Sequence, residues 1–213
     1  MPVDVVLTGP VPEPDRFVGE ICGFGTGSGV RIVIGRWEQS PLGAFADAMV
    51  ERPDGHRVLI APRLDVAEYV MSIYQFDELV ETAVVVERTP GSLTFRGGPL
   101  EARVTIGRRG RLGWLLRGVP RTLAASRIWP VLTDPVARVV MPGVRTRGLT
   151  AGGREAYTAR DLHHLVAVDA SWDGRDLGPL APLEPPVRFG FSSAPRRPAR
   201  SPWAIPTVQR VEM

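Results

Sequence analysis

Two arginines in the segment VMPGVRTRG, residues 140–148, have the spacing of an anion clamp. Arg145 and Arg147 lie two positions apart, so in an extended segment both guanidinium groups face the same side. Such a pair can bind a carboxylate or a phosphate through parallel hydrogen bonds, whereas an exposed, solvated pair is the alternative. Arg31 is a third candidate for holding the same anion.

Acid–base candidates gather in the segment GGREAYTARDLHH, residues 152–164. Glu155 and Tyr157 are candidate substrate-binding residues. Adjacent histidines on a strand point to opposite faces, so His163 can enter a cavity only if its neighbour does not. His163 is therefore a candidate catalytic residue, with Asp47 as a second one. The third histidine of the chain is distant in sequence, and we predict no metal site.

The residue types that are missing exclude several mechanisms. All 26 basic residues are arginine, so neither a lysine Schiff base nor a Walker A lysine is available. Cys22 is the only cysteine, which excludes an internal disulfide and sites that need several thiolates. The glycines of CGFGTGSG, residues 22–29, stand at every second position, which fits no phosphate-binding motif. We interpret this segment as a turn feeding a strand and expect no cofactor.

Charge is unevenly distributed along the chain. Residues 100–160 contain twelve arginines and three acidic residues, a net charge of +9, while the remainder carries −6. This asymmetry is consistent with an anion-binding face. The alternative is that these arginines pair with the acidic residues of the other part of the chain.

Short apolar or alternating runs separated by turn signals such as SPLG and RPDGH predict a mainly β protein. The predicted strands are Val30–Trp37, Phe45–Glu51, Arg57–Ala61, Glu68–Ile73, Ala83–Arg88, Ser92–Arg96, Leu100–Ile106, Arg160–Ala170 and Val187–Phe191. Residues 112–141 have helical spacing interrupted by prolines, which predicts a few short helices that cover a barrel.

The division of the chain follows from composition. Residues 1–191 are expected to form one β-rich domain, and residues 192–213, rich in proline and arginine, a C-terminal arm or tail. No apolar run approaches the length that spans a bilayer, and the first residues do not have the pattern of a signal peptide. We therefore expect a cytoplasmic protein, and the sequence leaves open whether copies of it form a homo-oligomer.

Two segments resemble the acetoacetate decarboxylase superfamily: GVRIVIGRWEQSPLGAFADAMVERPDGHR, residues 29–57, and HHLVAVDASWDGRDLGPLAPLEPPVRFGFSS, residues 163–193. The resemblance implies an antiparallel double barrel or cone around an apolar cavity, of the mainly β (α+β) class. It places Asp47 where the family has a pocket glutamate that positions substrate. The family's Schiff-base lysine has no counterpart here, so decarboxylation through a lysine imine is excluded.

Two functions follow as hypotheses. The first is binding, or conversion without an imine, of a small apolar organic acid or keto compound in a β-barrel pocket, with the anion held by arginine. Acid–base chemistry of the lyase or hydratase type would suit it if the protein is an enzyme. The second is an arginine-rich interaction module for nucleic acid, an anionic membrane or a partner protein. No RNA-binding or helix-turn-helix pattern supports the second hypothesis, so nucleic acid and membrane are the less favoured partners.

Overall fold

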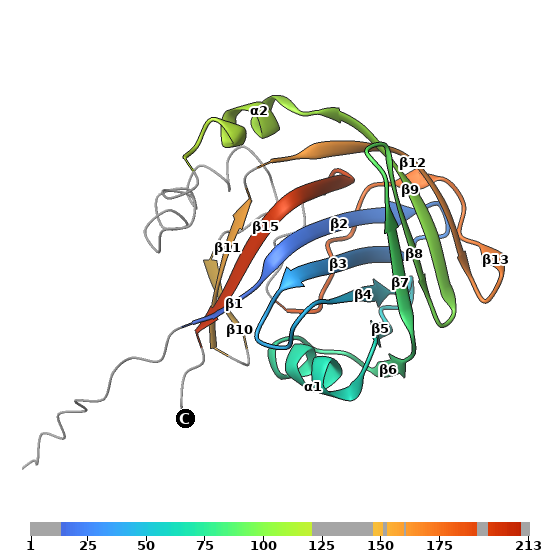
Figure 1. Cartoon of the computed structure of the whole chain (residues 1–213). Coiled ribbons are helices and arrows are strands. Elements are labelled where there is room, and N and C mark those ends of the chain that lie inside the picture. Colours follow the sequence, from blue (N-terminus) through green and yellow to red (C-terminus); the bar gives the residue numbers. More distant parts are fainter. Residues whose placement is uncertain (1–13, 121–146, 151–152, 160, 191–195, 210–213) are drawn as a thin grey trace, which may run out of the picture.

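Alternating apolar residues build a single sheet that curls on itself (Figure 1). The computed structural model describes residues 14–120, 147–150, 153–159, 161–190 and 196–209. Within these ranges the strands of the first half are β1 (Asp15–Arg16), β2 (Val18–Thr26), β3 (Arg31–Gln39), β4 (Phe45–Glu51), β5 (Arg57–Ala61), β6 (Glu78–Glu81), β7 (Val84–Arg88) and β8 (Ser92–Gly97). Those of the second half are β9 (Leu100–Arg109), β10 (Arg147–Thr150), β11 (Gly153–Ala159), β12 (His163–Trp172), β13 (Arg175–Asp176), β14 (Leu180–Ala181) and β15 (Ala199–Gln209).

The main path of the sheet runs β6-β5-β4-β3-β2-β15-β12-β9-β8-β7, and only the β5–β6 pair in it is parallel. The sheet bends until β7, at one end of the path, contacts β4 near the other end. Strands β1 and β11 also pair with β15. The prediction of a mainly antiparallel β fold is therefore confirmed.

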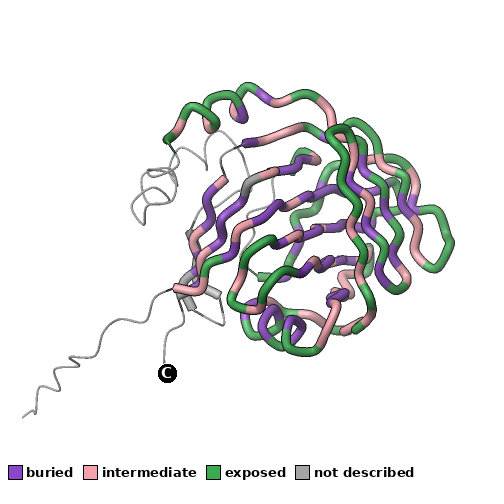
Figure 2. The backbone as a smooth tube through the Cα atoms, viewed as in Figure 1, coloured by how far each residue is buried: buried purple, intermediate pink, exposed green. Residues whose placement is uncertain are grey.

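Each central strand sends alternate side chains to two apolar cores, because successive residues of a strand point to opposite faces. Ile34 and Val50 belong to the core enclosed by the curl of the sheet. Trp37 and Phe45, on the same strands, belong to a second core beneath α1 (Leu64–Ile73). Figure 2 shows the buried residues along these strands and the exposed ones along the connections. The second core contains the cavity described below.

Several predicted boundaries agree with the structure. Strands β4 and β5 begin and end at the predicted residues, and the Pro53–Gly55 turn joins them as expected. In that turn Gly55 has a φ of +90°, which an L side chain rarely adopts. The predicted helical region begins at α2 (Arg111–Arg117), and its continuation over 121–141 lies outside the described residues.

Three expectations differ from the structure. The strand predicted at Glu68–Ile73 is wrong, because these residues form the C-terminal part of α1, whose buried side chains recur at helical spacing. Residues 187–190 form an irregular segment and not a strand. Ala199–Gln209, expected in an arm or tail, is β15, which pairs with β2 and β12 in the middle of the sheet.

Of the alternating glycines, Gly23 and Gly25 belong to β2, so the segment is not a turn throughout. A Cβ atom on Gly25 would lie 2.2 Å from the carbonyl oxygen of Pro182, so only glycine lets these two backbone segments approach. The turn itself follows at residues 27–29.

Candidate functional site

An apolar cavity of about 90 Å³ lies in the second core. It is lined by side chains from β2, β3, β4, β11 and β15, from Phe17, from α1 and the residue after it, and from residues 187–189. Seven of the seventeen lining residues are aromatic, although aromatic residues make up only 7% of the chain: Phe17, Trp37, Phe45, Tyr69, Tyr74, Tyr157 and Phe189. Two carboxyl groups, those of Asp47 and Glu155, interrupt this apolar wall.

Asp47 stands in the middle of β4, opposite Gly35 of β3, and is only 1% exposed. Trp37 Nε1–H donates a hydrogen bond of 3.0 Å to Asp47 Oδ1. The second oxygen, Oδ2, is buried and has no hydrogen-bond partner among the described residues. Burial raises the pKa of Asp47 to about 7, against the opposing effect of the Trp37 hydrogen bond.

Gly35 gives the Trp37–Asp47 pair its room. A Cβ atom at position 35 would lie 2.6 Å from Asp47 Oδ1 and 2.8 Å from Trp37 Nε1. The hydrogen bond therefore passes directly over a residue that has no side chain. The pairing of β3 with β4 and the missing side chain at Gly35 thus set the orientation of the Asp47 carboxyl.

Glu155 repeats this arrangement on the neighbouring part of the sheet. It is 5% exposed, on β11, and Tyr74, directly after α1, donates its hydroxyl hydrogen to Glu155 Oε1. Oε2 has no hydrogen-bond partner among the described residues. Burial raises the pKa of Glu155 to about 7, opposed by the Tyr74 hydrogen bond. The pKa of Tyr74 is itself raised, chiefly by burial and next by the charge of Glu155, so Tyr74 stays protonated and donates.

Tyr157 lies two residues beyond Glu155 and also lines the cavity. Burial raises the pKa of its hydroxyl above the usual range, so Tyr157 acts as a neutral hydrogen-bonding group. Three residues selected from the sequence, Asp47, Glu155 and Tyr157, thus meet at one cavity.

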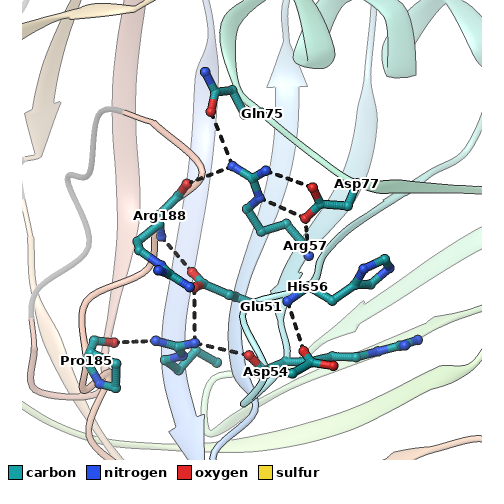
Figure 3. Close-up of polar contacts among 10 residues, drawn as sticks. Glu51, Asp54, His56, Arg57, Gln75, Asp77, Pro185 and Arg188 are labelled. Atoms are coloured by element: carbon teal, nitrogen blue, oxygen red, sulfur yellow. Dashed lines mark hydrogen bonds and ion pairs between the residues drawn. The ribbon is translucent and has the colours of Figure 1, made fainter.

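Arg31 lies on the same face of the sheet as Asp47 but at the far end of β3, outside the cavity lining. Its guanidinium pairs with the fully buried Glu51 at 3.1 Å and donates to the carbonyl oxygen of Pro185 at 2.8 Å. Glu51 also accepts from the backbone N–H of Arg188 at 2.6 Å and from Arg188 Nε at 2.9 Å (Figure 3).

The Glu51 network has a positioning role. Val187 and Phe189, on either side of Arg188, line the cavity. By holding both the backbone and the side chain of Arg188, Glu51 fixes the segment that completes the cavity wall. Arg31 is accordingly a structural counter-ion of Glu51.

The remaining sequence candidates lie elsewhere. His163 stands on β12, where Nδ1 is 3.3 Å from the carbonyl oxygen of Gly107 and Nε2 is 3.5 Å from Asp161, and it is not among the residues that line the cavity. Arg145 lies outside the described residues, and Arg147 is described only as the first residue of β10. Arg109, from the arginine-rich stretch, forms a two-point ion pair with Asp161.

Sequence reasoning missed Trp37 and Tyr74, the two donors that orient the carboxyls. Trp37 could have been found from strand alternation. It is two residues from Gly35, which pairs with Asp47, so Trp37 and Asp47 lie on the same face of the sheet. Tyr74 was hidden because the element before it was predicted to be a strand. In the part of the chain that the structure describes, no three His, Cys, Asp or Glu side chains gather in a way that could hold a metal ion. Among these residues there is also no helix with the length and hydropathy needed to cross a membrane.

No protein-family model matches the chain, and the search of curated proteins also found no match. Two solved structures resemble it over most of its length. One is an acetoacetate decarboxylase from Legionella pneumophila, with a TM-score of 0.43 and 10% identity, covering 99% of this chain and 96% of that one. The other comes from structural studies of acetoacetate decarboxylase, with a TM-score of 0.41 and 10% identity, covering 99% and 94%. At this level of similarity no residue of the chain takes its role from those structures.

Proposed function

We propose that the protein binds a small, mainly apolar keto compound or organic acid in this cavity, and that Asp47 and Glu155 exchange protons with it. The observation that supports the proposal is the pair of buried carboxyls, each with one oxygen fixed by an aromatic donor and the other without a hydrogen-bond partner in the described part of the chain. Buried carboxyls normally satisfy their oxygens within the protein, and an unpaired one is costly. A ligand that forms hydrogen bonds to these oxygens would remove that cost.

The charge of the cavity favours the keto compound over the organic anion. None of the described residues that line the cavity is an arginine or a histidine, while two carry carboxyl groups. An anion would therefore meet either like charge or two neutral acids. Arg31, a sequence candidate for holding an anion, lies outside the cavity lining and is paired with Glu51.

The pKa values of about 7 suit proton transfer, because at neutral pH each carboxyl is present in both its forms. A protonated carboxyl can donate a hydrogen bond to the keto oxygen while the ionised one removes a proton from the adjacent carbon. The C–H electron pair then forms the C=C bond of an enol, and the carbonyl π electrons take up the donated proton on oxygen. No lysine or imine is required for this step.

Exchange of α-hydrogens for deuterium tests the proposal directly. The purified protein is incubated in D₂O near neutral pD with a panel of small ketones, such as cyclohexanone and 2-pentanone, and the loss of the α-proton signal is followed by NMR. We expect exchange faster than in buffer, and a loss of about 100-fold in Asp47→Asn or Glu155→Gln, the usual contribution of one acid–base group. Glu101→Gln, an exposed carboxylate paired with Arg96, is the matched control.

His163→Gln separates this proposal from the sequence-based one, which assigned acid–base work to His163. Unchanged exchange in this variant is expected, since His163 lies outside the cavity lining. Exchange at the buffer rate with every ketone, or equal rates in Asp47→Asn, Glu155→Gln and the unmodified protein, would refute the proton-transfer role.

A further inference from the structure

The aromatic residues of the cavity form a connected cluster and are not scattered along its wall. The rings of Phe17 and Trp37 lie 5.6 Å apart at an interplanar angle of 71°, and those of Phe17 and Tyr69 lie 5.3 Å apart. Phe45 contacts both Phe17 and Trp37, with ring centroids 6.3 and 6.5 Å away. Aromatic faces carry partial negative charge, and several of them around one space attract a cation.

Trp37 connects this cluster to a carboxyl group. Its ring lines the cavity while its Nε1–H holds Asp47 Oδ1, so Asp47 stands at the margin of the aromatic cluster. Tyr74 relates to Glu155 in the same way, since it too lines the cavity and donates to a carboxyl oxygen. Both carboxyl groups therefore belong to a cavity wall that is rich in aromatic rings.

No described lining residue supplies a positive charge to balance these carboxyls. Arg31, on the same face of the sheet as Asp47, and Arg188, between two residues of the cavity wall, are both bound to Glu51. A carboxylate in this cavity thus lacks a counter-ion from the described part of the protein. Within an apolar environment such a charge attracts an opposite one strongly.

We infer that the cavity selects a small ligand with a positively charged nitrogen, an alkylammonium or quaternary ammonium compound with an apolar body. The inference rests on the proposed binding of a small molecule at this site and names its chemical class. The aromatic cluster would surround the alkyl groups on nitrogen, and the carboxylates would balance the charge. A keto compound that also carries such a nitrogen satisfies both proposals.

Isothermal titration calorimetry tests the inference with pairs of probes that have similar shape and differ in charge. It is carried out at about pH 8, where the carboxyls of Asp47 and Glu155 are mostly ionised. Choline is compared with 3,3-dimethyl-1-butanol, its uncharged isostere, and butylammonium with 1-butanol as a smaller pair. We expect the cation of at least one pair to bind about tenfold more tightly or better than its neutral partner, in line with the strength of a desolvated cation–π contact. The preference should fall in Asp47→Asn and in Glu155→Gln, and persist in the exposed control Glu101→Gln.

Each other outcome counts against the inference. If a neutral probe binds as tightly as its cation, the cavity binds small molecules but does not select for charge, and the proposed function survives alone. If a cation binds equally well to the unmodified protein and to both carboxyl variants, it binds elsewhere. If no probe binds, the ammonium class is wrong, and the deuterium exchange with ketones still decides the proposed function.

Discussion

Replacing Asp47 by asparagine should stabilise the protein at alkaline pH. Burial raises the pKa of Asp47 from its ordinary 3.8 to about 7, in spite of the hydrogen bond from Trp37. The folded state consequently keeps a proton over a pH range in which the unfolded chain has lost it. The free energy of unfolding then falls as pH rises through this range, because the folded state binds more protons than the unfolded state.

The magnitude follows from the two pKa values. At about 1.4 kcal/mol per pKa unit, a difference of roughly three units lowers the free energy of unfolding by about 4 kcal/mol once Asp47 is ionised in both the folded and the unfolded state. About 3 kcal/mol of this develops between about pH 5 and about pH 8. Asparagine keeps an oxygen that can accept from Trp37 Nε1–H but has no charge to bury. The Asp47→Asn variant should therefore lose this part of the pH dependence.

Urea unfolding at these two pH values, followed by circular dichroism, measures the effect, provided that the slope with urea is unchanged. Asp169→Asn, at an exposed position on β12, is the matched control and should leave the pH dependence as it is. If Asp47→Asn loses stability between the two pH values as steeply as the unmodified protein, the Asp47 carboxyl is not held neutral by burial. The argument for a proton-transfer group at this position would then fail.

Two further changes test how the cavity is held in shape. Glu51→Gln should lower the free energy of unfolding by about 3 kcal/mol or more, because it leaves the buried Arg31 guanidinium without its counter-ion, and urea unfolding measures this. Gly35→Ala should cost about 1–3 kcal/mol, since the added methyl group presses on the Trp37–Asp47 hydrogen bond; the melting temperature and the tryptophan fluorescence report it.

Each of these changes has a control of the same chemistry. Glu101→Gln removes an exposed partner of Arg96 and should alter stability by less than about 1 kcal/mol. Gly91→Ala adds a methyl group at a position where no other atom lies within 4 Å. If a variant loses no more stability than its own control, the residue concerned does not have the structural role described above.

The sequence predicts this fold best where strands are regular. The bounds of β4 and β5 were predicted correctly, because in both strands the run of apolar residues ends at a strong turn signal. Residues 68–73 of α1 were predicted as a strand because valine and isoleucine favour strands, and periodicity cannot separate a helix from a strand in so short an apolar run. Because the helix was not predicted, the position of Tyr74, the hydrogen-bond donor that orients Glu155, could not be predicted either.

The largest gap between sequence and structure concerns β15. Its two prolines, Pro202 and Pro206, argue against a central strand, because proline cannot donate to a sheet. The structure accommodates Pro202 where the register with β2 shifts, between Ser201 and Ala204. Such an irregularity depends on the neighbouring strand and leaves no mark in the local sequence. Glu155 and Tyr157 could be selected by residue type, but their meeting with Asp47 depends on β15, which brings β11 to this face.

Because β15 pairs with β2, the ribosome makes β2 long before it makes one of its partner strands. Glu20 on β2 and Arg200 on β15 form a buried ion pair although they are 180 residues apart. At ribosomal speeds of about 5–20 residues per second, β2 emerges roughly 10–40 s before the strand that covers its open edge. During that interval the nascent chain presents an unpaired, apolar strand edge, which is the kind of surface that other chains join. Slower translation of the region between β2 and β15 should therefore increase aggregation without changing the folded structure.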